Sequence, residues 1–130
     1  MNLMMTVPDS GAAPLLDFLD SLDPKLRVKL GSLFFMLMTT PPGLLREPYV
    51  KHFTIERYSS LYELRAKGNV MVRIIFTIRP DGDILFLTPF VKRHKRNTMQ
   101  ALDASLKQLS QIEDGICSVQ ELAINHITGG

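Results

Sequence analysis

The spacing of apolar residues changes twice along this chain, and this change restricts the possible folds more than any other feature of the sequence. Between residues 15 and 38, leucine, phenylalanine and methionine recur three or four positions apart, which is the spacing of one face of an α-helix. Between residues 61 and 90 the spacing becomes two, as in β-strands, and from residue 99 to 109 it is helical again. Helices, then strands, then a closing helix predict an α+β fold.

The first helical part predicts two helices packed as a hairpin. Leu15, Leu19 and their neighbours give the first helix one apolar face. Asp23 and Pro24 fit the N-cap and first position of the second helix, which a run of prolines and a glycine ends near residue 41. Residues 3–7 are expected to form a short strand before this hairpin.

The middle of the chain predicts a small antiparallel or mixed β-sheet, with the helical hairpin on one face. Strands are expected at 61–66, 70–78 and 84–90, separated by two tight turns. Alternation directs even-numbered residues of the central strand toward the helices and Arg73 toward the opposite, open face. A last helix is expected to start with Asn97 or Thr98 as its N-cap.

Length and composition predict one domain without a membrane span. The chain has 130 residues, and we expect the domain to occupy 1–114, followed by a tail at 115–130. The longest apolar run, 30–38, is too short to cross a bilayer, and residues 1–8 lack the features of a signal peptide. A single cysteine excludes an intrachain disulfide and a cysteine-rich zinc site. These features favour a cytoplasmic protein.

The charges are distributed unevenly, although the net charge is only +2. Residues 46–96 carry most of the lysines and arginines, whereas the rest of the chain has an excess of acids. Such asymmetry is typical of a surface that binds a polyanion. The alternative is an ordinary solvated face of the strands.

Three charged residues are expected on the open face of the sheet. A turn that pairs Ala66 with Val70 would place Glu63 opposite Arg73, with Arg65 nearby on the same face. Arginine suits a phosphate because its planar group contacts two oxygens at once. Arg65 and Arg73 could therefore hold a phosphate, with Glu63 orienting one of them. The alternative is a partly exposed ion pair between Glu63 and Arg73 without a function.

A second candidate is the basic segment after the third of these strands. Four cations surround His94, and histidine is a common acid or base in catalysis, so phosphate contacts and a possible acid or base occur together. The alternative is a solvated connector. No pair of histidines has metal-ligand spacing, and there is no glycine-rich phosphate loop or serine-hydrolase elbow. No metal site is predicted.

Three motifs occur in an order that resembles a known family: Leu61-Tyr62-Glu63-Leu64-Arg65, Val72-Arg73-Ile74-Ile75-Phe76 and Phe90-Val91-Lys92-Arg93-His94-Lys95. This set is similar to the phage-derived, HigB-type branch of the RelE-like toxins. Weaker similarities lie at 18–22 and 50–53, so the resemblance extends over about residues 15–110. Two departures are Val72, where the family usually has an aromatic residue, and Arg96-Asn97-Thr98, where it usually has Lys-Thr-Pro.

The resemblance implies a RelE-like fold and the toxin of a toxin–antitoxin pair. It implies an endoribonuclease that cuts messenger RNA, at the ribosome, without a metal or other cofactor, and a helix-turn-helix antitoxin as partner. The alternative is a non-catalytic relative, such as a gyrase-directed binding protein, or an inactive phage-derived form.

Cleavage of this kind uses the 2′-hydroxyl of the RNA as nucleophile against the adjacent phosphate. We expect Arg73, supported by Arg65, to stabilise the charge that develops on the phosphate. His94 is the expected general acid or base, and Glu63 the alternative base. The remaining candidates are cations that would position the RNA backbone: Lys92, Arg93, Lys95, Arg96 and Lys51.

Overall fold

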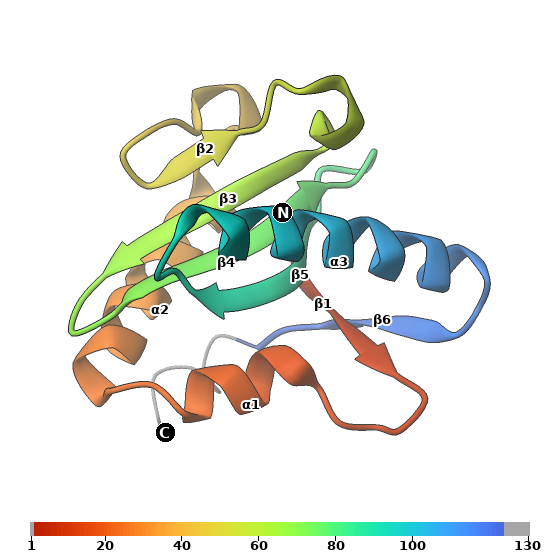
Figure 1. Cartoon of the computed structure of the whole chain (residues 1–130), viewed down its shortest axis with the longest axis horizontal. Helices are drawn as coiled ribbons and strands as arrows, with labels where there is room; N and C mark the ends of the chain where they lie inside the picture. The colour runs from red at the N-terminus through yellow and green to blue at the C-terminus, as the bar shows by residue number, and fades with distance from the viewer. Residues whose placement is uncertain (1, 124–130) are drawn as a thin grey trace.

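A six-stranded mixed sheet forms the centre of the molecule, with helices on both of its faces (Figure 1). The computed structural model describes residues 2–123. The elements, in chain order, are β1 (Leu3–Pro8), α1 (Pro14–Asp20), α2 (Pro24–Thr39), the 3-10 turn η1 (Pro42–Leu44), β2 (Val50–His52), the 3-10 turn η2 (Glu56–Tyr58), β3 (Leu61–Lys67), β4 (Met71–Ile78), β5 (Ile84–Val91), α3 (Lys95–Glu113) and β6 (Cys117–Glu121).

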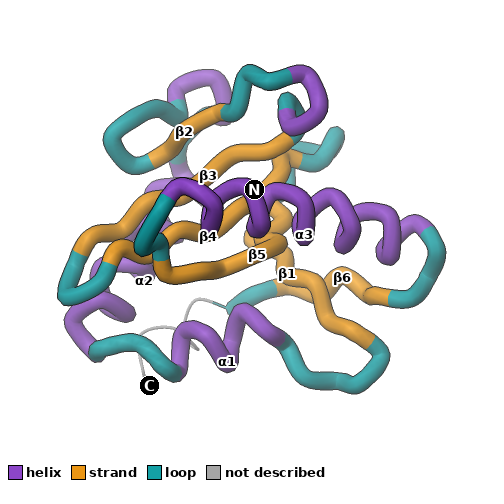
Figure 2. Tube along the Cα trace, viewed as in Figure 1, coloured by secondary structure: helices purple, strands orange, loops and turns teal. Residues whose placement is uncertain are grey.

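The strands follow the order β2-β3-β4-β5-β1-β6 across the sheet (Figure 2). The pair of β1 and β5 is parallel, and the other neighbours are antiparallel. The expected α+β fold with a mixed sheet is therefore confirmed. The strand expected at 3–7 is also present, and its Leu3, Met5 and Val7 are buried in the main core.

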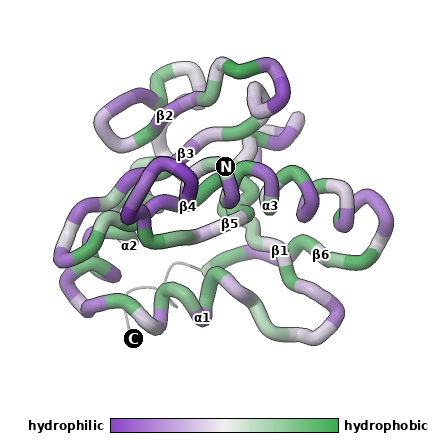
Figure 3. Tube along the Cα trace, in the orientation of Figure 1, coloured by the Kyte–Doolittle hydropathy of each residue, from purple (hydrophilic) through white to green (hydrophobic). Residues whose placement is uncertain are grey.

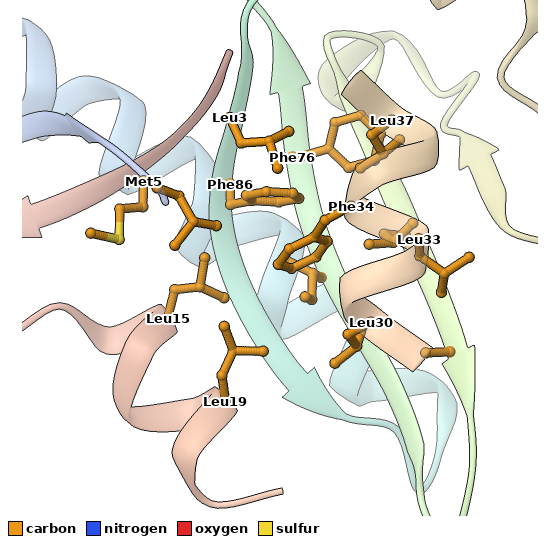
Figure 4. Close-up of a cluster of buried hydrophobic side chains, with 14 of the residues drawn as sticks. Leu3, Met5, Leu15, Leu19, Leu30, Leu33, Phe34, Leu37, Phe76 and Phe86 are labelled. Carbon is orange, nitrogen blue, oxygen red and sulfur yellow. The ribbon is translucent and has the colours of Figure 1, made fainter. Parts of the chain in front are cut away.

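The N-terminal helices cover one face of the sheet, as predicted. Asp23 accepts a hydrogen bond from the Lys25 amide at 2.8 Å and caps α2, with Pro24 in the first turn. Phe34 of α2 stacks on Phe86 of β5 with ring centroids 4.6 Å apart (Figure 4). The even-numbered residues of β4 face this core, again as predicted: Val72, Ile74, Phe76 and Ile78.

The opposite face is not open, because α3 covers part of it. Ile75 of β4 and Leu87 of β5 pack with Ala101 and Leu102 of α3 in a second core. Thr88 and Ser105 are hydrogen-bonded beside it at 2.7 Å. The expectation that this face is open was therefore wrong. The apolar stripe of α3 needs a surface to bury against, and apolar residues of the sheet on this side provide it.

A β-bulge in β5 decides which way its last residues face. Ile75 pairs with Thr88, but the next residue, Phe76, pairs with Phe86, so β5 has an additional residue at this point. Simple alternation from Phe86 would direct Phe90 toward α2. Because of the bulge, Phe90 lies opposite Arg73 and joins the core beneath α3.

The predicted boundaries differ from the structure in three places. Strand β2 was missed within 44–60, because three residues give too short a pattern. Helix α3 begins at Lys95, before the expected start at Asn97 or Thr98. Strand β6 comes from the predicted tail and pairs with β1, while residues 124–130 lie outside the described part of the chain. None of the helices within 2–123 has the length and apolar character needed to cross a membrane.

Candidate nucleic-acid interface

The register of β3 and β4 places two arginines directly opposite each other. Arg65 pairs with Arg73, and Lys67 pairs with Met71. The predicted pairing of Ala66 with Val70, which put Glu63 opposite Arg73, was wrong by two residues. The turn packs closely on α2, and a Cβ at Gly68 would lie 3.0 Å from Leu26 Cδ1. A shift of two residues keeps every side chain on its predicted face.

Glu63 lies between the two arginines and is almost completely buried, with 1% of its surface exposed. Its Oε1 accepts a hydrogen bond from Arg65 Nε at 2.9 Å and lies 3.6 Å from Arg73 Nε. Arg65 also contacts the exposed Glu47 at 3.1 Å. One buried carboxylate thus faces both guanidinium groups. The carboxylate was expected to orient one of the two arginines, and the alternative was an ion pair between Glu63 and Arg73 alone; in the structure it lies beside both arginines.

Arg73 is buried rather than placed on an open face, with 9% of its surface exposed. Burial lowers the pKa of its guanidinium; Glu63 opposes this effect and Arg65 adds to it. The group remains charged at neutral pH. Its Nη1 donates to the carbonyl of Val72 at 3.1 Å, while Nε finds no acceptor among residues 2–123.

Arg65 and Arg73 line a pocket of about 250 Å³, which we call the arginine pocket; its other lining residues are Lys29, Pro48, Tyr49 and Lys67. Sequence reasoning missed all four of these, three of which bring a cation or an aromatic ring to the pocket. Lys67 could have been found, because it continues the alternation of Glu63 and Arg65 along β3. Tyr49 and Lys29 give no local signal, since they reach the pocket from a loop and from α2. Tyr49 is 47% exposed, and its carbonyl accepts the Arg65 amide at 2.8 Å.

The basic segment forms the junction between β5 and α3, which is among the most hydrophilic parts of the chain (Figure 3). The junction and the β3–β4 turn lie at the same end of the sheet (Figure 1). The Lys92 amide donates to the Met71 carbonyl at 2.8 Å, which extends the ladder by one pair. The alternation after the bulge therefore assigns Lys92 to the face of Arg73.

His94 is the N-cap residue of α3 and is exposed. The Nδ1 atom of its ring lies 3.3 Å from Arg96 Nε. His94 is not among the residues that line the arginine pocket. The side chain of Asn97 accepts the amides of Arg93 and His94 at 2.9 and 3.0 Å. Lys95 and Arg96 are exposed in the first turn of α3.

The remaining predicted cation, Lys51, lies on β2 opposite Glu63 and is exposed. Its Nζ is 5.4 Å from the centre of the Phe53 ring. Within the described chain, no group of three or more histidine, cysteine, aspartate or glutamate residues is placed to hold a metal ion. The structure thus brings Arg65, Arg73 and Glu63 together, with Lys51 as the cross-strand neighbour of Glu63, and leaves His94 apart from them.

The chain matches the family described as phage-derived protein Gp49-like (DUF891) over residues 17–111. The matched part includes β3, β4, β5 and most of α3. The chain belongs to this family. The Gp49-like proteins are a family of RelE/HigB-like toxins. No curated protein matches the chain.

One departure from the resemblance can be explained on this fold. Val72 replaces an aromatic residue before the central arginine, which raised the question of whether the protein could stack on its substrate. In this Gp49-like protein Val72 is fully buried in the core beneath α1 and α2. A side chain at this position faces away from Arg73, so the replacement does not alter the arginine pocket.

Proposed function

We propose that this Gp49-like protein is the toxin of a toxin–antitoxin pair and an endoribonuclease that cleaves messenger RNA at the ribosome. The RNA's own 2′-hydroxyl attacks the adjacent phosphate, and no metal is required. Its partner would be a helix-turn-helix antitoxin. The observation that carries the proposal is the arginine pocket, in which two guanidinium groups meet at one buried carboxylate.

Arg73 is the proposed electrostatic catalyst. Its guanidinium is desolvated, and charge interactions are stronger in such surroundings than in water. Arg65 is more exposed and would bind a second oxygen of the same phosphate. Glu63 holds both arginines, and its Oε2 is buried without a hydrogen-bond partner within 2–123. Because this carboxylate is almost completely buried and faces both guanidinium groups, we assign Glu63 to positioning rather than to proton transfer.

The β5–α3 junction is the proposed site for the flanking RNA backbone. Lys95 and Arg96 stand in the first turn of a 19-residue helix, where the helix dipole disfavours cations. A bound phosphate would offset this cost. Lys92, Arg93 and Lys51 would add further contacts. His94 stays the proposed acid or base, since its imidazole is exposed beside this surface.

The aromatic ring of Tyr49 supports RNA rather than a small anion as the ligand. Half-exposed aromatic side chains beside cations are the usual platform for unpaired bases. Tyr49 could therefore stack on a base next to the scissile phosphate.

The test compares the wild-type protein with Arg73→Lys in a primer-extension assay on messenger RNA, with and without ribosomes. Lysine keeps the positive charge beside Glu63 but cannot contact two oxygens at once. We expect cleavage to slow by about 10²–10³-fold. Circular dichroism should show an unchanged fold. An Arg73→Lys variant that folds and cuts at the wild-type rate would refute the assigned role.

A second candidate function is RNA binding without cleavage. It is favoured by the lining of the arginine pocket, whose charged groups are all cations and which does not include His94. In that case the wild-type protein would bind RNA but leave it intact with and without ribosomes.

A further inference from the structure

A second hollow lies next to the arginine pocket, around the β3–β4 turn. It has a volume of about 340 Å³, and its lining includes Lys25 and Lys29 of α2, Lys67 of β3 and the turn residue Asn69. Lys29 and Lys67 line both hollows. The two are therefore neighbours that share a basic wall. We call the second hollow the lysine subsite.

Contacts between α2 and the turn shape this subsite and hold one of its lysines. Lys29 Nζ donates to the Lys67 carbonyl at 2.6 Å. Gly68 approaches Leu26 so closely that a Cβ would lie 3.0 Å from its Cδ1. The lining also includes one acid, Asp23, whose Oδ1 accepts the Lys25 amide as the cap of α2. Three lysines thus line the subsite against this single carboxylate.

The chemistry of the lining indicates which part of a ligand would bind here. Lysine ammonium groups bind phosphates as point charges, without the planar geometry that arginine imposes. Among the described residues that line the subsite there is no aromatic side chain on which a base could stack. The subsite is therefore suited to the backbone of a nucleic acid rather than to its bases.

We propose that the lysine subsite binds a backbone phosphate of the same RNA strand whose scissile phosphate occupies the arginine pocket. The strand would pass over the β3–β4 turn, from Arg73 toward the start of α2. This inference rests on the proposed function. It adds a direction for the strand and a contact that does not depend on base sequence.

The experiment measures binding of 2′-O-methyl RNA, which lacks the nucleophilic hydroxyl and cannot be cut by the proposed route. The probes are a dinucleotide and an oligomer of about ten nucleotides, within the usual range of single-strand sites. The protein variants are Lys25→Gln and Lys25→Glu, because Lys25 lines only the lysine subsite. Lys107→Gln and Lys107→Glu make the same charge changes on the exposed surface of α3 and serve as controls.

Loss of one phosphate contact should reduce the slope of log K against log salt by about 0.7. Lys25→Gln should therefore bind the oligomer about fivefold more weakly near 0.1 M salt, and Lys25→Glu more weakly still. Binding of the dinucleotide should not change in the Gln variant, because it reaches only the arginine pocket. The Lys107 variants should keep the wild-type slope.

An unchanged slope and affinity in both Lys25 variants would overturn the lysine subsite. Equal losses in the Lys25 and Lys107 variants would overturn it as well, since the effect would then be one of overall charge. A wild-type protein that binds the oligomer but cleaves no unmodified RNA would refute the proposed nuclease. In that case the comparison of slopes still decides whether the subsite exists.

Discussion

Arg65 and Arg73 lie directly opposite each other, a position in which like charges destabilise a sheet. Glu63 compensates for this repulsion from the same face of β3, with its Oε1 near both guanidinium groups. Since Glu63 is 1% exposed, water cannot replace it as the counter-charge. The two guanidinium groups can therefore lie side by side at the arginine pocket because the Glu63 carboxylate balances their charge.

Glu63→Gln should lower the free energy of unfolding by about 3 kcal/mol, because it leaves buried Arg73 without its counter-charge. Glu47→Gln is the matched control, since Glu47 contacts the same Arg65 from an exposed position. Its loss should cost less than about 1 kcal/mol. Urea unfolding of both variants measures the difference. Equal stabilities would mean that Glu63 does not hold the arginines together.

Tyr49→Ala should weaken binding of single-stranded RNA by about 1–3 kcal/mol if the ring stacks on a base. Tyr49→Phe keeps the aromatic face and should bind as the wild-type protein does. Fluorescence anisotropy with a labelled oligonucleotide checks both variants. Because Tyr49 is 47% exposed, neither change should affect the melting temperature much. A Tyr49→Ala variant with wild-type affinity would exclude stacking at this position.

At the scale of elements, two features of β5 and α3 place the basic segment. The bulge in β5 directs Phe90, and by alternation Lys92, to the face of Arg73. The side chain of Asn97 then holds the backbone of Arg93 and His94 at the start of α3. The junction therefore has a defined conformation although its side chains are exposed.

Asn97→Ala should destabilise the protein by about 1 kcal/mol, the usual cost of losing a helix cap. Asn97→Asp keeps an acceptor oxygen and adds a negative charge at the helix N-terminus, so its stability should match or exceed that of the wild type. Thermal unfolding compares the three proteins. If Asn97→Ala and Asn97→Asp lose the same stability, the two hydrogen bonds are not what holds the junction.

At the scale of the whole molecule, the two ends of the described chain meet in the sheet. Strand β1 lies between β5 and β6, and its Leu3, Met5 and Val7 belong to the main core. Strand β6 is at the edge and is mostly exposed, although Leu122 just beyond it is buried. The two strands therefore contribute very differently to stability, although both lie near the ends of the chain.

Removal of residues 2–8 should prevent folding. Each buried side chain of β1 contributes about 1.5–3 kcal/mol, and three of them approach the total stability of a typical domain. A chain that ends at residue 115 should still fold, with reduced stability, because it loses, of the described core, only the edge strand and the buried side chain of Leu122. Circular dichroism and urea unfolding of both truncations test this. A folded chain without β1, or an unfolded chain 1–115, would contradict the argument; the second result would also refute the predicted domain 1–114.

The sequence by itself determined the parts of this protein that depend on neighbouring residues. Apolar spacing defined α2 and the strands β3, β4 and β5 to within a residue or two, since side-chain direction repeats with a fixed period in each element. The same alternation assigned Arg65, Arg73 and Glu63 to one face. That assignment survived an error of two residues in the register, because only an odd shift exchanges the faces.

The tertiary structure alone decided which residues meet at the site. The burial of Arg73, the bulge that redirects Lys92, and the approach of Tyr49 and Lys29 depend on contacts between segments far apart in the chain. So does the position of α3, whose apolar stripe fits either face of a sheet until the N-terminal helices occupy one of them. Local patterns carry no information on such contacts, because they arise only when the elements pack together.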